Sequence, residues 1–150
     1  MRVVVQRVSM SQVFVEGKMK SEIASGCLIY LGIEQADDKT DADWLVKKIN
    51  HLRIFDDDSG VMNLSLLDIS GEVLIISQFT LHAKTKKGNR PSYIRAASSE
   101  KAEDLYNYFI RRFKDETTLT VKSGVFGAHM KVSSRNDGPV TILMDSKNRE

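Results

Sequence analysis

The chain has 150 residues, of which 41% are hydrophobic and 28% are charged, and this balance is typical of one water-soluble globular domain. Lys and Arg number 22 and Asp and Glu number 20, so the net charge of +2 gives no reason to expect a nucleic-acid or membrane partner unless a local patch provides one. No repeat or linker divides the sequence, so we expect a single domain over residues 1–150, with a polar tail at about residues 146–150 that frays.

The first half of the chain carries four strand patterns and one helix pattern. Val3–Val8 and Val13–Val15 are rich in β-branched residues, and we expect these two strands to pair as a first hairpin. Gly26–Ile33 and Glu72–Leu81 are apolar runs of the kind that are buried on both faces of a sheet. Thr40–Leu52 begins with an N-cap residue and acids, and it then repeats apolar residues at helical spacing.

The second half predicts one clear helix followed by three short strands. Ala102–Phe113 repeats apolar residues at i, i+3, i+4 and i+7 and carries charged residues on the other side. Thr118–Lys122, His129–Ser133 and Val140–Met144 are strand patterns separated by glycine-containing turns. This order predicts an α/β fold, a mixed β-sheet or barrel-like core with two amphipathic helices packed on it.

The cellular location is predicted from a single cysteine and from the first residues. Cys27 is alone, within the apolar run Cys27–Leu31, so no intrachain disulfide is possible and we expect a buried thiol in a reducing compartment. Met1–Arg7 is too short and too soon charged for a signal peptide, and no apolar run approaches membrane-spanning length. We therefore expect a cytoplasmic protein with no membrane partner.

Four familiar kinds of site are absent or incomplete. Asp56–Gly60 resembles the start of a calcium loop, but its glycine comes one residue early and Leu67 replaces the bidentate glutamate, which favours a solvated hairpin turn. His51, His82 and His129 lack the spacing of a zinc site. Neither a phosphate-binding glycine loop nor a serine-hydrolase elbow is present, so we expect no metal and no cofactor.

Polar residues stand where the apolar run that begins at Val73 ends. Ser77, Gln78 and Thr80 either satisfy local backbone groups or face a pocket. If the strand continues, Gln78, Thr80 and His82 share one face. Thr80 and His82 make a weak nucleophile and base, because alternate strand residues are roughly 7 Å apart at Cα and nothing in the sequence orients the imidazole.

Gly138–Pro139, within Asn136–Thr141, is one of only two X-Pro bonds in the chain. Glycine adopts backbone angles that are closed to other residues, and proline fixes its own φ, lacks an N–H and permits a cis bond. Such a dipeptide is either an ordinary turn or a means of aiming main-chain carbonyl oxygens into a pocket. In the second case the carbonyls would sense the stereochemistry of a bound carbon without using any side chain.

A local basic patch follows the polar segment. Lys84, Lys86, Lys87 and Arg90 place four cations within seven residues. By composition alone this is a solvated basic loop. Beside a nucleotide pocket, the same cations would contact RNA phosphates without reading the base sequence.

Several motifs, in order and in register, resemble those of the D-aminoacyl-tRNA deacylase family. They are Ser77–Leu81, Gly124–Ala128 and Asn136–Thr141, together with Met1–Val8, Leu52–Phe55, Met62–Ser65 and Lys87–Ser92. The resemblance covers the chain up to Asp145, so it extends well beyond a single short motif.

The resemblance implies a homodimer whose active sites lie at the subunit interface, with tRNA as the partner. It implies a cis Gly138–Pro139 bond that reaches into the other subunit's pocket, where it admits D-aminoacyl and glycyl esters and leaves no room for an L side chain. Arg7 would brace this loop across the interface, and Phe126 and Met130 would line the pocket. The residues that would hold the terminal adenosine and the ester are Ser77, Gln78, Phe79 and Thr80.

The implied reaction is hydrolysis of the ester between a D-amino acid and the terminal ribose of tRNA. The Phe79 N–H would donate to the oxyanion, a contribution that is typically worth about 3 kcal/mol. The attack would come either from Thr80 or from water activated by the 2′-hydroxyl of the tRNA, and we favour water because no base stands beside Thr80. No role is implied for His82 or His129. A hydrolase of small D-aminoacyl esters and a non-catalytic dimer that binds RNA ends remain as alternatives.

Overall fold

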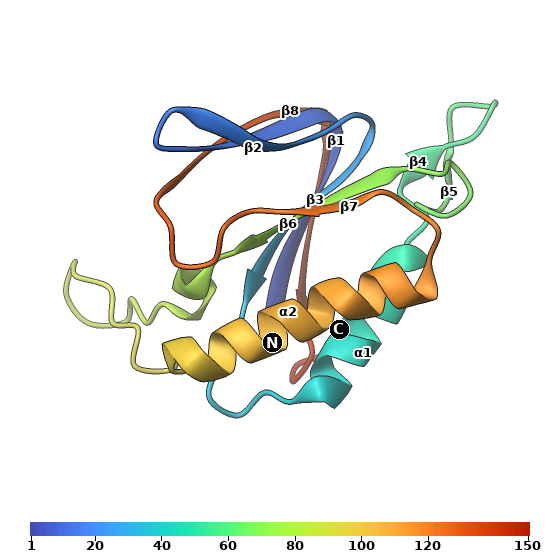
Figure 1. The fold of residues 1–150 in the computed structure, drawn as a ribbon. Coiled ribbons are helices and arrows are strands. Elements are labelled where there is room, and N and C mark those ends of the chain that lie inside the picture. Colours follow the sequence, from blue (N-terminus) through green and yellow to red (C-terminus); the bar gives the residue numbers. More distant parts are fainter.

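Two helices lie side by side against a mixed, six-stranded sheet (Figure 1). The computed structural model describes residues 1–150. The elements are β1 (Arg2–Val15), β2 (Lys18–Ile23), β3 (Gly26–Gly32), α1 (Lys39–Asn50), β4 (Phe55–Asp56), β5 (Met62–Leu64), β6 (Glu72–Ser77), the 3-10 helix η1 (Phe79–His82), α2 (Ser99–Glu116), β7 (Val121–Ser123) and β8 (Met130–Asp145). The sheet order is β2-β1-β3-β6-β7 with β8 also paired to β1, while β4 and β5 form a separate pair.

The large sheet curls until its outer strands nearly meet. β3, β6 and β7 run parallel, whereas β1 is antiparallel to β2, β3 and β8. β1 pairs with β3 over its first half and with β2 over its second half, so the sheet bends around this one long strand. At the two outer strands, the Ser21 hydroxyl of β2 donates to the Ser123 carbonyl of β7 at 2.6 Å. The expected mixed, barrel-like sheet with two helices is confirmed.

The centre of the sheet is apolar on both faces, as the sequence predicts. In β3 and β6 nearly every residue between Gly26 and Gly32 and between Val73 and Ile76 is buried. Cys27 is 1% exposed in this layer, and burial raises the pKa of its thiol to about 12. The thiol therefore stays protonated at neutral pH.

Both predicted amphipathic helices are present, and each buries its apolar stripe against the sheet. The N-cap of α1 is Asp38, two residues before the predicted cap at Thr40, because the Asp38 carboxylate accepts from the Thr40 N–H at 2.8 Å and Asp41 closes a capping box. In α2 the Tyr106 hydroxyl donates to the Ile75 carbonyl at 2.8 Å, and burial raises the pKa of Tyr106 to about 12. The fully buried core of the α2 stripe comprises Phe109 and Phe113.

The predicted first hairpin is wrong in its pairing. Val3–Val8 and Val13–Val15 belong to the single strand β1, whose hairpin partner is β2. The turn is formed by Glu16 and Gly17, both with positive φ. β2 carries no apolar alternation because it is a largely exposed outer strand, so the sequence pattern did not reveal it.

The predicted strand Glu72–Leu81 is too long. β6 ends at Ser77, and the chain then turns into η1, with the Ala83 N–H donating to the Thr80 carbonyl at 3.0 Å. Gly32, at the end of β3, approaches this turn closely: a Cβ there would lie 2.9 Å from the Gln78 carbonyl oxygen and 2.9 Å from Leu81 Cβ. The strand alternation that was expected for residues 78–82 therefore does not exist.

The C-terminal strands also differ from the prediction. The strand expected at Thr118–Lys122 is β7, three residues long and starting at Val121. The strands expected at His129–Ser133 and Val140–Met144 are one strand, β8, which begins at Met130 and whose pairing with β1 shifts register around Val8, opposite the Gly138–Pro139 segment.

The last residues are tied down, in contrast to the expected frayed tail. Ser146 is 4% exposed, and its hydroxyl accepts from the Met1 ammonium at 2.9 Å. Lys147 pairs with the Asp41 carboxylate at 2.8 Å, and the Arg149 guanidinium lies over the Trp44 ring at 4.4 Å. These contacts tether the tail to α1.

Neither α1 nor α2 has the length and apolarity that a membrane-crossing helix needs.

Candidate active site

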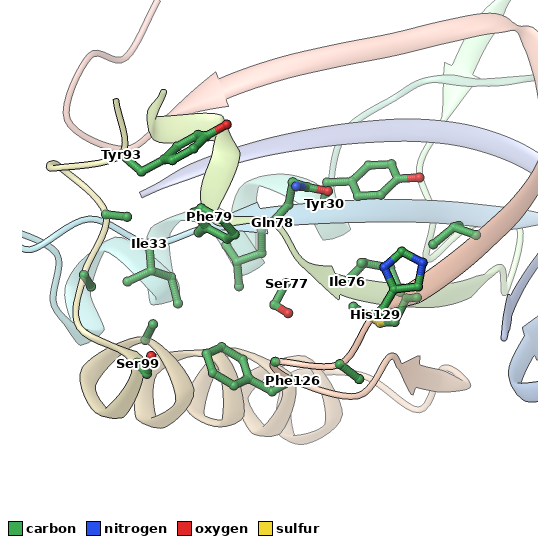
Figure 2. Close-up of a pocket in the computed structure, with 18 residues that line it drawn as sticks. Tyr30, Ile33, Ile76, Ser77, Gln78, Phe79, Tyr93, Ser99, Phe126 and His129 are labelled. Carbon is green, nitrogen blue, oxygen red and sulfur yellow. The ribbon is translucent and has the colours of Figure 1, made fainter. Parts of the chain in front are cut away.

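A pocket of about 620 Å³ opens between the end of β6 and the turn that precedes β8 (Figure 2). The residues that line it are Tyr30, Leu31, Ile33, Ile76, Ser77, Gln78, Phe79, Tyr93, Ala96, Ala97, Ser99, Ala102, Phe126, Gly127, Ala128, His129, Met130 and Val132. We call it the first pocket. It brings together five of the residues expected at the site, namely Ser77, Gln78, Phe79, Phe126 and Met130.

The polar wall of the first pocket is formed where β6 ends. The Gln78 N–H donates to the Leu31 carbonyl at 2.7 Å, so the backbone of β6 remains attached to β3 one residue past the strand. The half-buried Ser77 side chain lies at the centre of the pocket between Phe79 and Phe126 (Figure 2). Polar groups thus meet an otherwise apolar hollow along one short segment.

The opposite wall is aromatic and sulfur-containing. The Phe126 ring packs against the Tyr106 ring with centroids 5.7 Å apart, and this contact places Phe126 beside α2. Met130 fills the space next to Gly124, where a Cβ would come within 2.5 Å of its sulfur. Gly127 has a φ of +72°, which lets the chain reverse between these two side chains.

The first pocket has almost no charge of its own. No Asp, Glu, Lys or Arg lines it, and its one imidazole, His129, is exposed at the end remote from Phe79 (Figure 2). Tyr30, next to His129, has a pKa raised by burial, so its phenol stays neutral. The structure contains no group of three His, Cys, Asp or Glu side chains that is arranged to hold a metal ion. The pocket suits a neutral ligand with apolar faces.

Thr80 lies outside the first pocket, unlike the other three residues of its motif. It lines a second pocket of about 980 Å³, bounded by α1, β8 and the C-terminal residues. Its hydroxyl accepts from the Gln78 side-chain amide at 2.5 Å. The turn of η1 therefore divides the expected catalytic segment between two hollows, with Ser77, Gln78 and Phe79 on one side and Thr80 on the other.

Gly138 and Pro139 are exposed and do not line the first pocket of their own chain. The peptide bond between them is cis. Arg7, which is 7% exposed, holds this segment from within the same chain: its Nε donates to the Asp137 carbonyl at 3.0 Å and its Nη1 donates to the Ile54 carbonyl at 2.8 Å. Arg7 thus fixes the base of an exposed loop.

His82, the last residue of η1, is buried, although the strand alternation would have placed it with Thr80. It is 1% exposed, and neither ring nitrogen has a hydrogen-bond partner. Its Nδ1 lies 3.9 Å from the Glu34 carboxylate, which accepts from Arg95 Nη2 at 2.8 Å. Burial lowers the pKa of His82, so the ring is neutral near pH 7. It is too enclosed to serve Thr80 as a base.

The basic residues of the expected tRNA-binding loop all lie on the surface beside the first pocket. Those residues are Lys84, Lys86, Lys87 and Arg90, and each is exposed. The loop is closed at its base by reciprocal main-chain hydrogen bonds between Lys84 and Ser92, of 2.8 and 3.0 Å. It returns to the pocket at Tyr93, so the base of the loop lies at the pocket's rim, while none of its four cations lines the pocket.

Sequence reasoning did not identify several lining residues. Tyr30 interrupts an apolar strand with a hydroxyl, and this was a usable signal for a pocket wall. Tyr93 follows the basic loop and was another signal, because an aromatic residue beside cations is typical of nucleic-acid contacts. Ala96, Ala97 and Ala102 contribute only by being small, so they left no signal.

Comparisons with known proteins agree over the whole chain. The family model described as D-Tyr-tRNA(Tyr) deacylase matches residues 4–145. A D-aminoacyl-tRNA deacylase from Phocaeicola vulgatus is 59% identical and one from Flavobacterium johnsoniae is 53% identical, each with the full length of both chains covered.

Solved structures show the same fold. One described as c-Myc DNA unwinding element binding protein has a TM-score of 0.92 at 40% identity, covering 97% of this chain and 98% of its own. Another, described as a probable eukaryotic D-amino acid tRNA deacylase, has a TM-score of 0.79 at 18% identity, with 95% and 97% covered, and supports the fold alone. On the family model and the relatives together, the chain belongs to the D-aminoacyl-tRNA deacylase family of ester hydrolases.

Proposed function

We propose that this protein hydrolyses the ester that joins a D-amino acid, or glycine, to the 3′-terminal adenosine of tRNA. The observation that carries the proposal is the first pocket, which has no Asp, Glu, Lys or Arg in its lining, is largely apolar, carries the polar segment Ser77–Gln78, and is bordered by a basic loop. Family membership supports the same reaction. The products are the free amino acid and intact tRNA.

The terminal adenosine suits the first pocket in size and chemistry. A volume of about 620 Å³ falls within the range that holds one small ligand. Phe126 and Met130 offer an aromatic and a polarisable surface for a flat base. Phosphates would be poorly placed among uncharged walls, so the chain of the tRNA would leave at the rim, beside the basic loop.

The chemistry needs a held carbonyl and a water molecule. Water oxygen adds to the ester carbonyl, the developing oxyanion accepts a hydrogen bond from the Phe79 N–H, and the bond from carbonyl carbon to the ribose 3′ oxygen then breaks. The ribose oxygen takes up a proton as it leaves. The neighbouring 2′-hydroxyl of the substrate would orient and activate the water, because no side chain of the first pocket other than the exposed His129 can act as a base.

Thr80 is better suited to position Gln78 than to attack the ester. Its hydroxyl is engaged with the Gln78 amide, which cannot remove a proton, and it lies on the second-pocket side of η1. An uncharged threonine hydroxyl without a base is a weak nucleophile. We therefore assign Thr80 a positioning role.

The rejection of L-aminoacyl esters is proposed to come from Gly138–Pro139 of a second copy in a homodimer. In one chain this loop is exposed, is held at its base by Arg7, and lies apart from the first pocket. Only another molecule could bring such a loop to the ester. Arg7 would act on its own subunit's loop, and that loop would complete the partner's site.

The test is paired incubation with D-tyrosyl-tRNA and L-tyrosyl-tRNA, followed by release of labelled tyrosine. We expect rapid release from the D ester and release from the L ester at the rate without enzyme. Glycyl-tRNA should behave as the D ester does. Equal hydrolysis of both stereoisomers would rule out the stereochemical part, and no hydrolysis of either would rule out the deacylase.

A further inference from the structure

Two exposed aromatic side chains, Phe79 and Tyr93, line the first pocket next to the basic loop, and the exposed Ile94 follows Tyr93 in the chain. Phe79 is 56% exposed, Tyr93 39% and Ile94 80%. Figure 2 shows Phe79 and Tyr93 at one end of the pocket, opposite His129. We call these three residues the aromatic step. The hydrolytic chemistry described above uses the Phe79 N–H and leaves all three side chains without a task.

The aromatic step has a defined geometry. The rings of Phe79 and Tyr93 meet edge to face, with centroids 5.0 Å apart and an interplanar angle of 74°. The chain is fixed on both sides of Tyr93, by the Ser92–Lys84 hydrogen bonds before it and by the Arg95–Glu34 ion pair after it. A pair of rings held in this way is preorganised to receive a flat ligand.

The charge beside the aromatic step is of one sign. Between Ala83 and Ile94 the chain carries four cations and no acid. Exposed aromatic rings beside a run of cations are the usual combination for single-stranded nucleic acid, because bases stack on the rings while phosphates pair with the cations. The ligand expected at this point is therefore a nucleotide.

We propose that the aromatic step is a stacking subsite for the base of the nucleotide that precedes the terminal adenosine, which in tRNA is a cytosine. The inference rests on the proposed function, since it assumes that the adenosine occupies the first pocket. The pocket has room for one nucleoside, so the preceding nucleotide must lie at the rim. There its base would stack on Tyr93 and contact Ile94, while its phosphate would face the basic loop.

The experiment compares three D-tyrosyl esters: D-tyrosyl-adenosine, D-tyrosyl-cytidylyl-adenosine, and the same dinucleotide with an abasic ribose in place of the cytidine. The abasic ester keeps the phosphate and lacks the base, so the last two substrates isolate stacking. For the wild-type protein we expect kcat/KM to be about tenfold higher with the cytosine than without it, since one stacked base is worth about 1–3 kcal/mol.

Variants assign that gain to the aromatic step. Tyr93→Ala should remove the difference between the cytosine and the abasic ester, whereas Tyr93→Trp, which keeps a ring, should retain it. Tyr108→Ala is the matched control, because Tyr108 lies on α2 and bonds to Asp43 instead of lining the first pocket. A cytosine gain that survives in Tyr93→Ala overturns the subsite.

Two further measurements separate the possible failures. Calorimetric titration with unesterified cytidylyl-adenosine and with adenosine tests the subsite even if no ester is hydrolysed: binding that is equally tight for both ligands overturns it. If none of the three esters is hydrolysed, but cytidylyl-adenosine binds more tightly than adenosine and Tyr93→Ala abolishes this difference, the result supports the subsite and counts against the deacylase.

Sedimentation of Tyr93→Ala and Ile94→Ala tests the other occupant, a second copy of this chain. Dissociation of an oligomer in these variants overturns the nucleotide assignment.

Discussion

The two pockets that flank η1 differ in a way that the continuous motif Ser77–Thr80 conceals. The first pocket has no Asp, Glu, Lys or Arg in its lining and is largely apolar. The second is lined by Arg2, Lys48, Asp145 and Arg149 among others, and two of these charged groups, Arg2 and Asp145, pair with each other at 2.8 Å. A 3-10 helix has about three residues per turn, so successive side chains point in different directions and meet different surroundings. A motif that is contiguous in sequence is therefore not evidence for one contiguous site.

The largest effect should come from filling the first pocket while leaving the second unchanged. Ala102→Trp, on the pocket face of α2, places an indole where the adenosine would sit, and we expect kcat/KM for D-tyrosyl-tRNA to fall about 100-fold, or roughly 3 kcal/mol. Lys48→Trp adds the same side chain at a helical, exposed position of the second pocket and should change the rate less than threefold, roughly 0.7 kcal/mol. Circular dichroism checks that both variants fold. A larger loss of kcat/KM in Lys48→Trp than in Ala102→Trp would show that the substrate binds in the second pocket.

A smaller effect should distinguish the cations beside each pocket. The double variant Lys86→Ala with Lys87→Ala removes two charges from the basic loop. We expect tRNA binding to weaken about tenfold, and the slope of log K against log salt concentration to become shallower by roughly 1.4 to 1.8. The matched double variant on α1, Lys47→Ala with Lys48→Ala, removes the same charge beside the second pocket. Its salt slope should equal that of the wild type. Equal slopes in all three proteins would contradict the proposed path of the tRNA.

The next smaller effect concerns Thr80. Removing the nucleophile of a hydrolase costs about a millionfold in rate, whereas losing one hydrogen bond costs about 1 kcal/mol. We expect Thr80→Ala to retain at least roughly a tenth of the wild-type kcat, because it loses only its bond to Gln78. Single-turnover kinetics with saturating protein measures this directly. Total loss of activity in Thr80→Ala, with full activity in Thr80→Ser, would show that the hydroxyl at position 80 is the nucleophile.

The smallest effect is on stability and involves His82, which lies between the pockets. Its pKa in the folded protein is lowered by burial below the ordinary 6.5, so the unfolded chain binds the proton more readily. His82 therefore contributes stability that is complete above pH 6.5 and is lost as the pH falls towards its folded pKa. The free energy of unfolding, from urea titrations between about pH 7.5 and about pH 5, should fall less steeply for His82→Leu than for the wild type. His51→Gln, at an exposed position, is the control for removing a histidine elsewhere in the chain.

The parts of this fold that the sequence predicts are those with a strong hydrophobic pattern. β3 and β6 are continuous apolar runs, and the stripes of α1 and α2 leave a single choice of buried face. β2 was not predicted because Lys18–Ile23 forms an outer strand that is stabilised by pairing rather than by burial. Ile23 is the only fully buried residue of β2, and one buried residue makes no hydrophobic period.

For the site, the sequence identified the residues better than it identified their arrangement. Ser77, Gln78 and Phe79 do line a pocket together with Phe126. The position of Thr80 could not be predicted, because a strand and a 3-10 turn are equally compatible with Ser-Gln-Phe-Thr and the choice depends on contacts with β3. Arg7 could have been recognised as buried, since it follows Val3 and Val5 on the inward face of β1.

Those contacts with β3 centre on Gly32, which lines neither pocket. A side chain there would collide with the Gln78 carbonyl and Leu81 Cβ, each at 2.9 Å, and with His82 at 3.1 Å. A single methyl group would therefore displace η1 and re-aim Ser77, Phe79 and Thr80 together. In mutational scans this position should behave as part of the active site while contacting no substrate atom. The geometry of the site thus depends on the absence of a Cβ at Gly32, and any redesign of the pockets has to keep glycine at this position.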